Sequence, residues 1–138
     1  MSDVTIILGK GGLLLFTAGL LIGAAIPRFV NSRMGLSAHL TAVQTGTALI
    51  AFGLFWPYFE ITQTLSRILA YSLLSSSYVL VVGLIIAAIF GASANLPIAG
   101  KGFHSSPAKE LIVSILVFSS SGLMAITCVG ICLFAVVL

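Results

Sequence analysis

Long apolar runs alternate with short polar segments along the whole chain, and the charged side chains gather near the ends of the runs. Backbone polar groups in lipid must be hydrogen-bonded within the chain, and the runs lack the strict alternation of barrel strands. Each run is therefore predicted to be a membrane-spanning helix. The predicted fold is all-α, a single four-transmembrane-helix bundle over residues 1–138. Its spans are predicted at residues 4–26, 36–55, 68–90 and 107–138.

Small residues recur within these runs and predict helices that approach one another closely, because a glycine lets two backbones come into contact. The glycines with this expected role are Gly19, Gly23, Gly46, Gly53, Gly83, Gly122 and Gly130.

Composition strengthens the membrane prediction. Hydrophobic residues make up 59% of the chain and charged residues 7%, whereas about a quarter of a soluble domain is charged. The first run lacks a small-residue cleavage site followed by a polar domain, so it is predicted to be a span and not a removable signal peptide. We expect a multi-pass protein of the bacterial inner membrane, in contact with lipid.

The net charge of +3 comes from cations that stand singly near the ends of the runs. This spacing is typical of interfacial anchors, and it predicts no nucleic-acid partner because such a site needs a cluster. The loops after the first and third runs hold more cations than the other side, but the difference is too small to fix the orientation.

His39 is the main candidate for chemistry. It lies about one turn into the second run, and an ionisable side chain within a span is costly and usually functional. A neutral imidazole is also a common ligand of metals and haem iron. The alternative is a histidine near the interface that only hydrogen-bonds water or a neighbouring serine.

Small side chains share the helix face of His39. A helix places Ala42, Val43 and Gly46 beside it, which leaves room for a large flat cofactor or for an ordinary helix contact.

Hydroxyl groups form a second candidate site in the third run. Tyr71, Ser75 and Tyr78 share one helix face and are predicted either to line a substrate pocket facing the second run or to form hydrogen bonds between helices.

Cys128 and Cys132 are one turn apart in the fourth run. Their apolar neighbours favour two small buried side chains over a metal site or a redox pair.

Several functions are disfavoured by missing groups. The sequence has no phosphate-binding loop and no dinucleotide fingerprint. None of its acids, Asp3, Glu60 and Glu110, lies deep in a predicted span, whereas small four-helix multidrug exporters carry a carboxylate in the first helix.

Two segments resemble the hydroxylaminobenzene mutases, which are related to styrene oxide isomerase. One is Met34-Gly35-Leu36-Ser37-Ala38-His39-Leu40, followed by Gly46 and Trp56-Pro57. The other is Leu96-Pro97-Ile98-Ala99-Gly100-Lys101-Gly102, followed by Glu110. The resemblance extends from the first run to Glu110.

The resemblance implies a membrane-bound isomerase that forms a homotrimer and holds haem b between subunits. His39 matches the histidine that ligates the iron in styrene oxide isomerase, where ferric iron acts as a Lewis acid on the substrate oxygen. The implied reaction is rearrangement of a hydroxylaminoarene, a small aromatic substrate, to an aminophenol. Ala42, Val43 and Gly46 are expected beside the haem, and Thr45 and Tyr78 are the expected catalytic residues.

Two positions depart from the family pattern. The mutases carry Glu two residues after the histidine and Asn before the later glycine, and here these residues are Thr41 and Thr45. The exact substrate is therefore open. Three alternatives remain: an aryl epoxide isomerase, a non-catalytic haem-binding membrane protein, and a small transporter or scaffold in which His39 is structural.

Overall fold

Four long α-helices make up most of the described part of the chain, residues 3–96 and 98–136 of a computed structural model. Each of the four is long and apolar enough to cross a membrane, so the predicted all-α membrane bundle is confirmed. Short 3-10 turns, Ile26–Arg28 and Trp56–Tyr58, end the first two helices. The long helices are α1 Asp3–Ala25, α2 Ser32–Phe55, α3 Gln63–Phe90 and α4 Pro107–Val136.

Two helices begin earlier than the apolar pattern predicts. Helix α2 begins at Ser32 and α3 at Gln63, because their first turns are polar and hydropathy alone does not register them. His39 consequently lies about two turns into α2, and the expectation of one turn was wrong. Residues 137–138 of the predicted fourth span lie outside the described residues.

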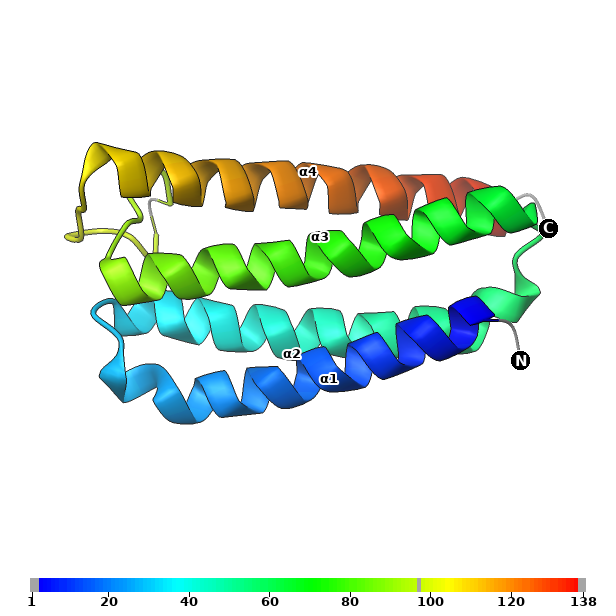
Figure 1. The fold of residues 1–138 in the computed structure, drawn as a ribbon, viewed down its shortest axis with the longest axis horizontal. Coiled ribbons are helices and arrows are strands. Elements are labelled where there is room, and N and C mark those ends of the chain that lie inside the picture. The colour runs from blue at the N-terminus through cyan, green and yellow to red at the C-terminus, as the bar shows by residue number, and fades with distance from the viewer. Residues whose placement is uncertain (1–2, 97, 137–138) are drawn as a thin grey trace.

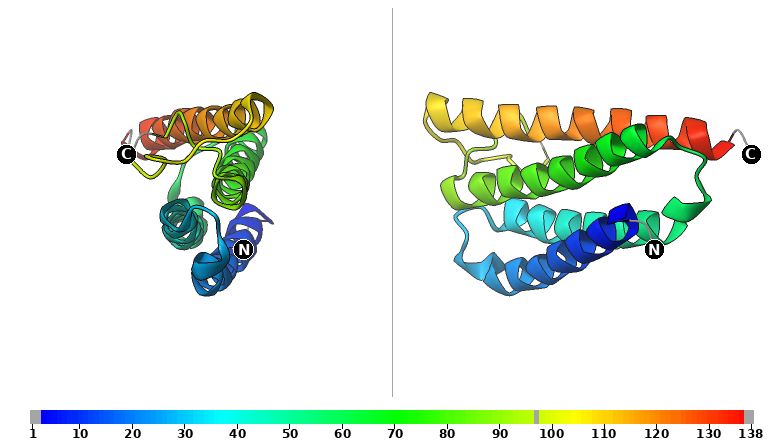
Figure 2. Two further views of the ribbon diagram at one scale, coloured as in Figure 1. Left: turned by 90° about the vertical axis from the view of Figure 1, so that its left-hand side faces the viewer. Right: turned by 45° about the vertical axis from the view of Figure 1, so that its right-hand side comes forward.

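The helices form two hairpins, α1 with α2 and α3 with α4 (Figure 1). Helix α3 packs against all three other helices, whereas α4 packs against α3 alone among the described helices. In the end-on view α4 lies on the far side of α3 from α1 (Figure 2). The bundle is therefore open, with broad helix faces left without a partner.

Glycines set the close contact between α1 and α2. A Cβ on Gly12 would lie 2.6 Å from the Gly46 carbonyl oxygen, and a Cβ on Gly46 would lie 2.6 Å from the Phe16 nitrogen. The expected close approach is thus confirmed at Gly46. It is wrong at Gly122, where a Cβ would meet nothing within 4 Å because α4 turns this position away from α3.

The loop end of the bundle is fixed by two polar side chains. Asn31 is fully buried; its Oδ1 accepts a bond from the Met34 nitrogen at 3.1 Å and its Nδ2 donates to the Ala99 oxygen at 2.9 Å. The Glu110 carboxylate accepts from the Ala94 and Ser105 nitrogens, both at 2.9 Å. The Asn31 bonds join the α1–α2 connection to the α3–α4 loop, and the Glu110 bonds join that loop to the first turn of α4.

We expect Asn31→Ala to lower the free energy of unfolding by about 2–3 kcal/mol, because it removes a helix cap and leaves the Ala99 carbonyl unpaired. Asn95→Ala is the matched control, since Asn95 is exposed and its amide donates to the Ser114 hydroxyl. Unfolding in detergent measures both variants, and equal losses would contradict the role given to Asn31.

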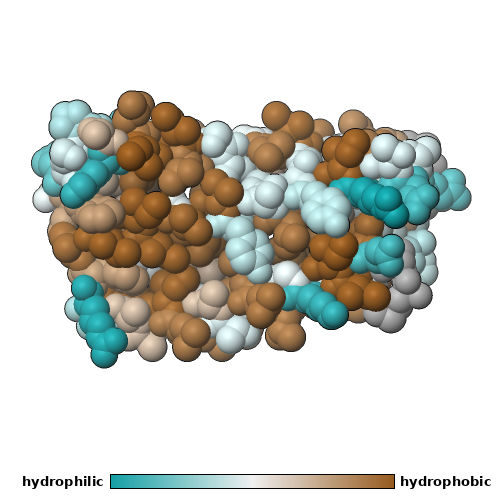
Figure 3. All heavy atoms as spheres, in the orientation of Figure 1, coloured by the Kyte–Doolittle hydropathy of each residue, from teal (hydrophilic) through white to brown (hydrophobic). Residues whose placement is uncertain are grey.

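The surface agrees with a lipid environment. Many large apolar side chains are exposed on α1, α2 and α4, among them Leu14, Leu21, Leu54 and Ile126. Figure 3 shows a largely hydrophobic face whose most hydrophilic residues lie toward the two ends of the bundle.

Candidate functional site

The imidazole of His39 lies between α2 and α1, half-buried against two glycines. Its Nδ1 is 2.7 Å from the carbonyl oxygen of Gly19. A Cβ on Gly23 would come within 2.7 Å of the same nitrogen, so only a glycine leaves space for the ring there. The ring is thus held by backbone features of α1 that the sequence pattern did not reveal.

The contact with Gly19 fixes the role of each ring nitrogen. A carbonyl oxygen only accepts hydrogen bonds, so the neutral ring must carry its proton on Nδ1. The lone pair is then on Nε2, and no protein hydrogen bond to Nε2 occurs within the described residues. A histidine that donates Nδ1–H to a backbone carbonyl and offers Nε2 is the usual arrangement of a metal ligand.

The donor set suits haem better than a bare ion. Among the described residues no three His, Cys, Asp or Glu side chains lie together as a metal site. A haem brings its own equatorial ligands and needs one axial side chain from the protein. Leu36 and Leu40, which flank His39 on α2, are exposed and add apolar surface beside it.

The small residues near His39 do not border open space in the single chain. Ala42 is fully buried, and a Cβ on Gly19 would lie 2.9 Å from Val43. The space expected for a cofactor beside Ala42, Val43 and Gly46 is instead occupied by α1, because the glycines bring the two backbones together. Cofactor contact at these positions stays a prediction without support from this packing.

Thr41 and Thr45, the two positions that depart from the mutases, bond to each other. The Thr45 hydroxyl donates to the Thr41 carbonyl at 2.7 Å, and both residues are half-buried. Thr45 is six residues beyond His39, so it lies about 9 Å further along α2. Its catalytic role stays a prediction.

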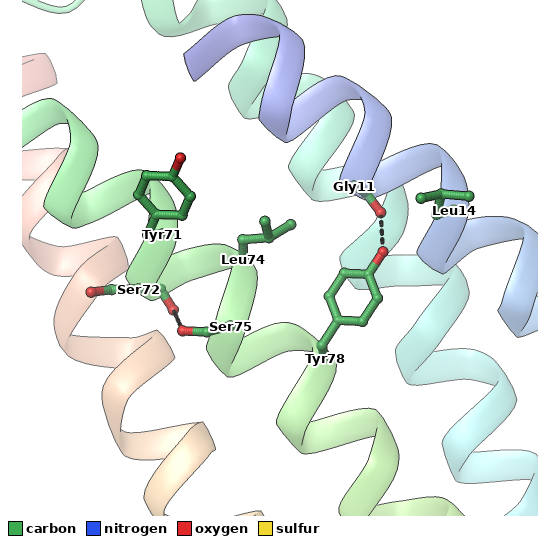
Figure 4. Close-up of a pocket in the computed structure, with 7 residues that line it drawn as sticks. All are labelled: Gly11, Leu14, Tyr71, Ser72, Leu74, Ser75 and Tyr78. Carbon is green, nitrogen blue, oxygen red and sulfur yellow. Dashed lines mark hydrogen bonds between the residues drawn. The ribbon is translucent and has the colours of Figure 1, made fainter. Parts of the chain in front are cut away.

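A groove of about 590 Å³ lies between α1 and α3, and we call it the α1–α3 groove. The Tyr78 hydroxyl crosses it and donates to the Gly11 carbonyl at 2.8 Å (Figure 4). Its lining residues are Gly11, Leu14, Tyr71, Ser72, Leu74, Ser75 and Tyr78.

The predicted hydroxyl face of the third run is therefore present, but its opposite wall is α1. The expectation that this face meets α2 was wrong, because helical periodicity identifies residues that share a face and not the helix that covers them. Gly11 and Gly19 are eight residues apart, which is about 12 Å along α1. The structure thus does not bring Tyr78 and His39 together within one chain.

The remaining candidates lie apart from both regions. Cys128 is half-buried and Cys132 exposed, both as free thiols on α4. His104 is exposed in the α3–α4 loop. The sequence pattern did not predict that Asn31 and Glu110 fix the loop end of the bundle. Their hydrogen-bond partners are distant in sequence or are backbone groups, so no local pattern reveals them.

Comparisons with known proteins identify the family of the chain. Residues 6–136 match the family described as styrene oxide isomerase. The chain is 39% identical to hydroxylaminobenzene mutase HabA of Ectopseudomonas oleovorans over 109 residues, which cover 78% of this chain and 81% of HabA. It is 31% identical to hydroxylaminobenzene mutase HabB of the same organism over 118 residues, covering 85% of this chain and 72% of HabB.

The family match spans almost the whole chain, including His39, the α1–α2 glycines and the α3–α4 loop. Both curated relatives are named as mutases, which are isomerases. The resemblance noted from the two sequence segments is confirmed, and the chain belongs to the styrene oxide isomerase family of isomerases.

Proposed function

We propose that this protein is a haem-dependent membrane isomerase that rearranges hydroxylaminobenzene-type arenes to 2-aminophenols. The substrate class is supported by the names of the two relatives, at 39% and 31% identity. The observation that carries the haem proposal is the His39 geometry, with Nδ1 bonded to the Gly19 carbonyl and Nε2 available as an axial ligand.

The bound ferric haem would supply a Lewis acid that polarises the oxygen of the substrate. The protein's own contribution begins with His39, which offers a nitrogen in one tautomer and one orientation. Leu36 and Leu40 add apolar surface beside it, and the apolar surroundings of a membrane pocket would strengthen electrostatic interactions at the site. In the reaction oxygen moves from nitrogen to an ortho carbon while a ring proton is lost and nitrogen gains one, so no external oxidant or reductant is consumed.

We further propose a homotrimer in the bacterial inner membrane. The family resemblance supports the trimer, and the open bundle agrees with it, since α4 has only α3 as a helix partner among those described. His39 is half-buried in one chain, so a second chain has room to complete its surroundings.

Aryl epoxide isomerisation is the second candidate, because the matching family is described as styrene oxide isomerase. Purified protein without nicotinamide should be given hydroxylaminobenzene and styrene oxide in parallel, with product analysis. We expect 2-aminophenol to form faster than the aldehyde. Conversion of styrene oxide alone would favour epoxide isomerisation as the function. Conversion of neither substrate would overturn the proposed function.

Thr45→Asn should change the preference between these two substrates about fivefold or more, because an amide adds a donor and an acceptor where the threonine hydroxyl is tied to Thr41. Thr47→Asn is the control, since Thr47 is exposed and bonded to the Val43 carbonyl. An unchanged ratio of kcat/KM values in Thr45→Asn would show that this position does not face the substrate.

A further inference from the structure

Three hollows adjoin one another along α3. The α1–α3 groove shares Tyr71 with a hollow of about 350 Å³ that also contains Asp3 and Arg67. It shares Ser75 with a hollow of about 210 Å³ between α3 and α4, which Ser119 and Ser120 also line. The three hollows therefore follow one another along α3, from its first turns near Arg67 to Ser75.

The hollow nearest the chain termini is polar, and the α1–α3 groove beside it is mostly apolar with a few hydroxyls. Asp3 and Arg67 are exposed charged residues near the first turns of α1 and α3, where the bundle meets water. Further in, the walls are mostly apolar, from Leu14, Leu74 and the tyrosine rings. Hydroxyls then recur at helical spacing on this wall of α3, at Tyr71, Ser75 and Tyr78.

These hydroxyls can still form hydrogen bonds with a small molecule. Tyr78 donates its proton to Gly11, which leaves the lone pairs of its oxygen as acceptors. Ser75 is exposed and makes a long bond of 3.3 Å to the Ser72 carbonyl. Tyr71 is 53% exposed at the point where two of the hollows meet. Figure 4 shows these side chains along the same stretch of α3.

Size and chemistry restrict the occupant. Small-molecule sites are about 300–1,000 Å³, apolar in most of their lining, with a few polar groups that orient the ligand. The groove of about 590 Å³ fits that description. An acyl chain could use only the apolar wall, whereas an aromatic ring with one hydrogen-bonding substituent can also donate to the lone pairs that Tyr78 and Ser75 keep free.

We propose that the α1–α3 groove is a second binding site for the aromatic substrate, separate from the His39 site, which collects arylhydroxylamine molecules from the membrane interface. The ring lies between Leu14, Leu74 and the tyrosines, and the N–OH group bonds to Ser75 and Tyr78. The identity of the molecule rests on the proposed function. The site itself rests on the shape and lining of the groove.

Photolabelling with phenyl azide tests this site without any catalysis. The protein, carrying His39→Ala so that turnover is absent, is illuminated in lipid nanodiscs, and labelled residues are mapped by mass spectrometry. We expect labels to concentrate on residues 71–78 and 11–14. Excess hydroxylaminobenzene should reduce them about fivefold or more, as for competition at one site. Ser75→Leu, which fills the groove, should reduce them similarly, whereas Ser75→Ala should not.

Each other result overturns the proposal. Labels spread evenly over the exposed faces of α1 and α4, or groove labels that hydroxylaminobenzene does not reduce, would show lipid as the occupant. No groove label at all would show that a second copy of the chain covers it.

Kinetics separates this proposal from the proposed function. With His39 intact, Tyr71→Phe and Ser75→Leu should raise KM about three- to tenfold with little change in kcat, in keeping with the loss of one hydrogen bond or of access. Tyr58→Phe is the control, because Tyr58 is exposed outside the groove. Labelling of the groove in a protein that does not rearrange hydroxylaminobenzene would support the second binding site and reject the proposed function. Rearrangement with an unchanged KM in both variants would support the proposed function and reject the second binding site.

Discussion

His39→Ala is expected to abolish haem binding and rearrangement while the bundle stays folded. The ring is only half-buried and its one hydrogen bond within the described part of the chain goes to Gly19, so its loss has a small effect on packing. It removes the axial nitrogen that the proposed site offers, and we expect activity to fall by about a thousandfold or more, because Lewis-acid stabilisation by a metal contributes several kcal/mol. Absorbance in the Soret region and product formation measure the two effects.

His104→Ala is the matched control for this experiment. His104 is the other histidine of the chain and is exposed in the α3–α4 loop, away from the α1–α2 contact. It should keep full haem content and activity. Adding imidazole to His39→Ala should restore part of the haem binding, because free imidazole has the nitrogen that the variant lacks. A His39→Ala protein that retains haem and activity would disprove the assignment.

Gly46→Leu is expected to cause the largest loss of stability, because this position lies where α1 and α2 are closest. Even a Cβ here would meet the backbone of Phe16 at 2.6 Å and the carbonyl oxygen of Gly12 at 2.8 Å. Backbone atoms cannot move aside as a flexible side chain does, so the two helices must separate. We expect a loss of about 3 kcal/mol or more in the free energy of unfolding, measured by denaturant titration in detergent.

The same change tests whether helix contact supports the imidazole. Separation of α1 from α2 should break the bond between His39 Nδ1 and the Gly19 carbonyl, so Gly46→Leu should also lose haem. Gly122→Leu is the control, since a Cβ there meets nothing within 4 Å, and it should preserve both stability and haem content. Equal stability of the two variants would contradict the close α1–α2 contact.

Much of the fold could be predicted from hydropathy, because a helix in lipid must be about twenty apolar residues long and leaves a long apolar run in the sequence. The starts of α2 and α3 could not, because Ser32, Arg33 and Gln63 are polar residues in the first turns of the helices. The cap on α2 from Asn31 also has partners at Ser93 and Ala99, which no local pattern connects to it.

The candidate site was predictable in its residue types but not in its contacts. His39 stood out as an ionisable group within a span, yet its partner is a backbone carbonyl of Gly19, which carries no side-chain signal. The hydroxyl face of α3 was visible from spacing, but its partner helix depended on the packing of the whole bundle. In the segment 96–102, the position of Gly100 requires a glycine, since a Cβ there would collide with the Ser93 carbonyl oxygen.

The most direct test of the central claim is the absorption spectrum of the purified protein in detergent, recorded before and after addition of hemin. The account predicts a Soret band that stays with the protein through gel filtration, together with conversion of hydroxylaminobenzene to 2-aminophenol. A protein that performs this conversion with no Soret band, even after hemin is added, would contradict the haem-based mechanism.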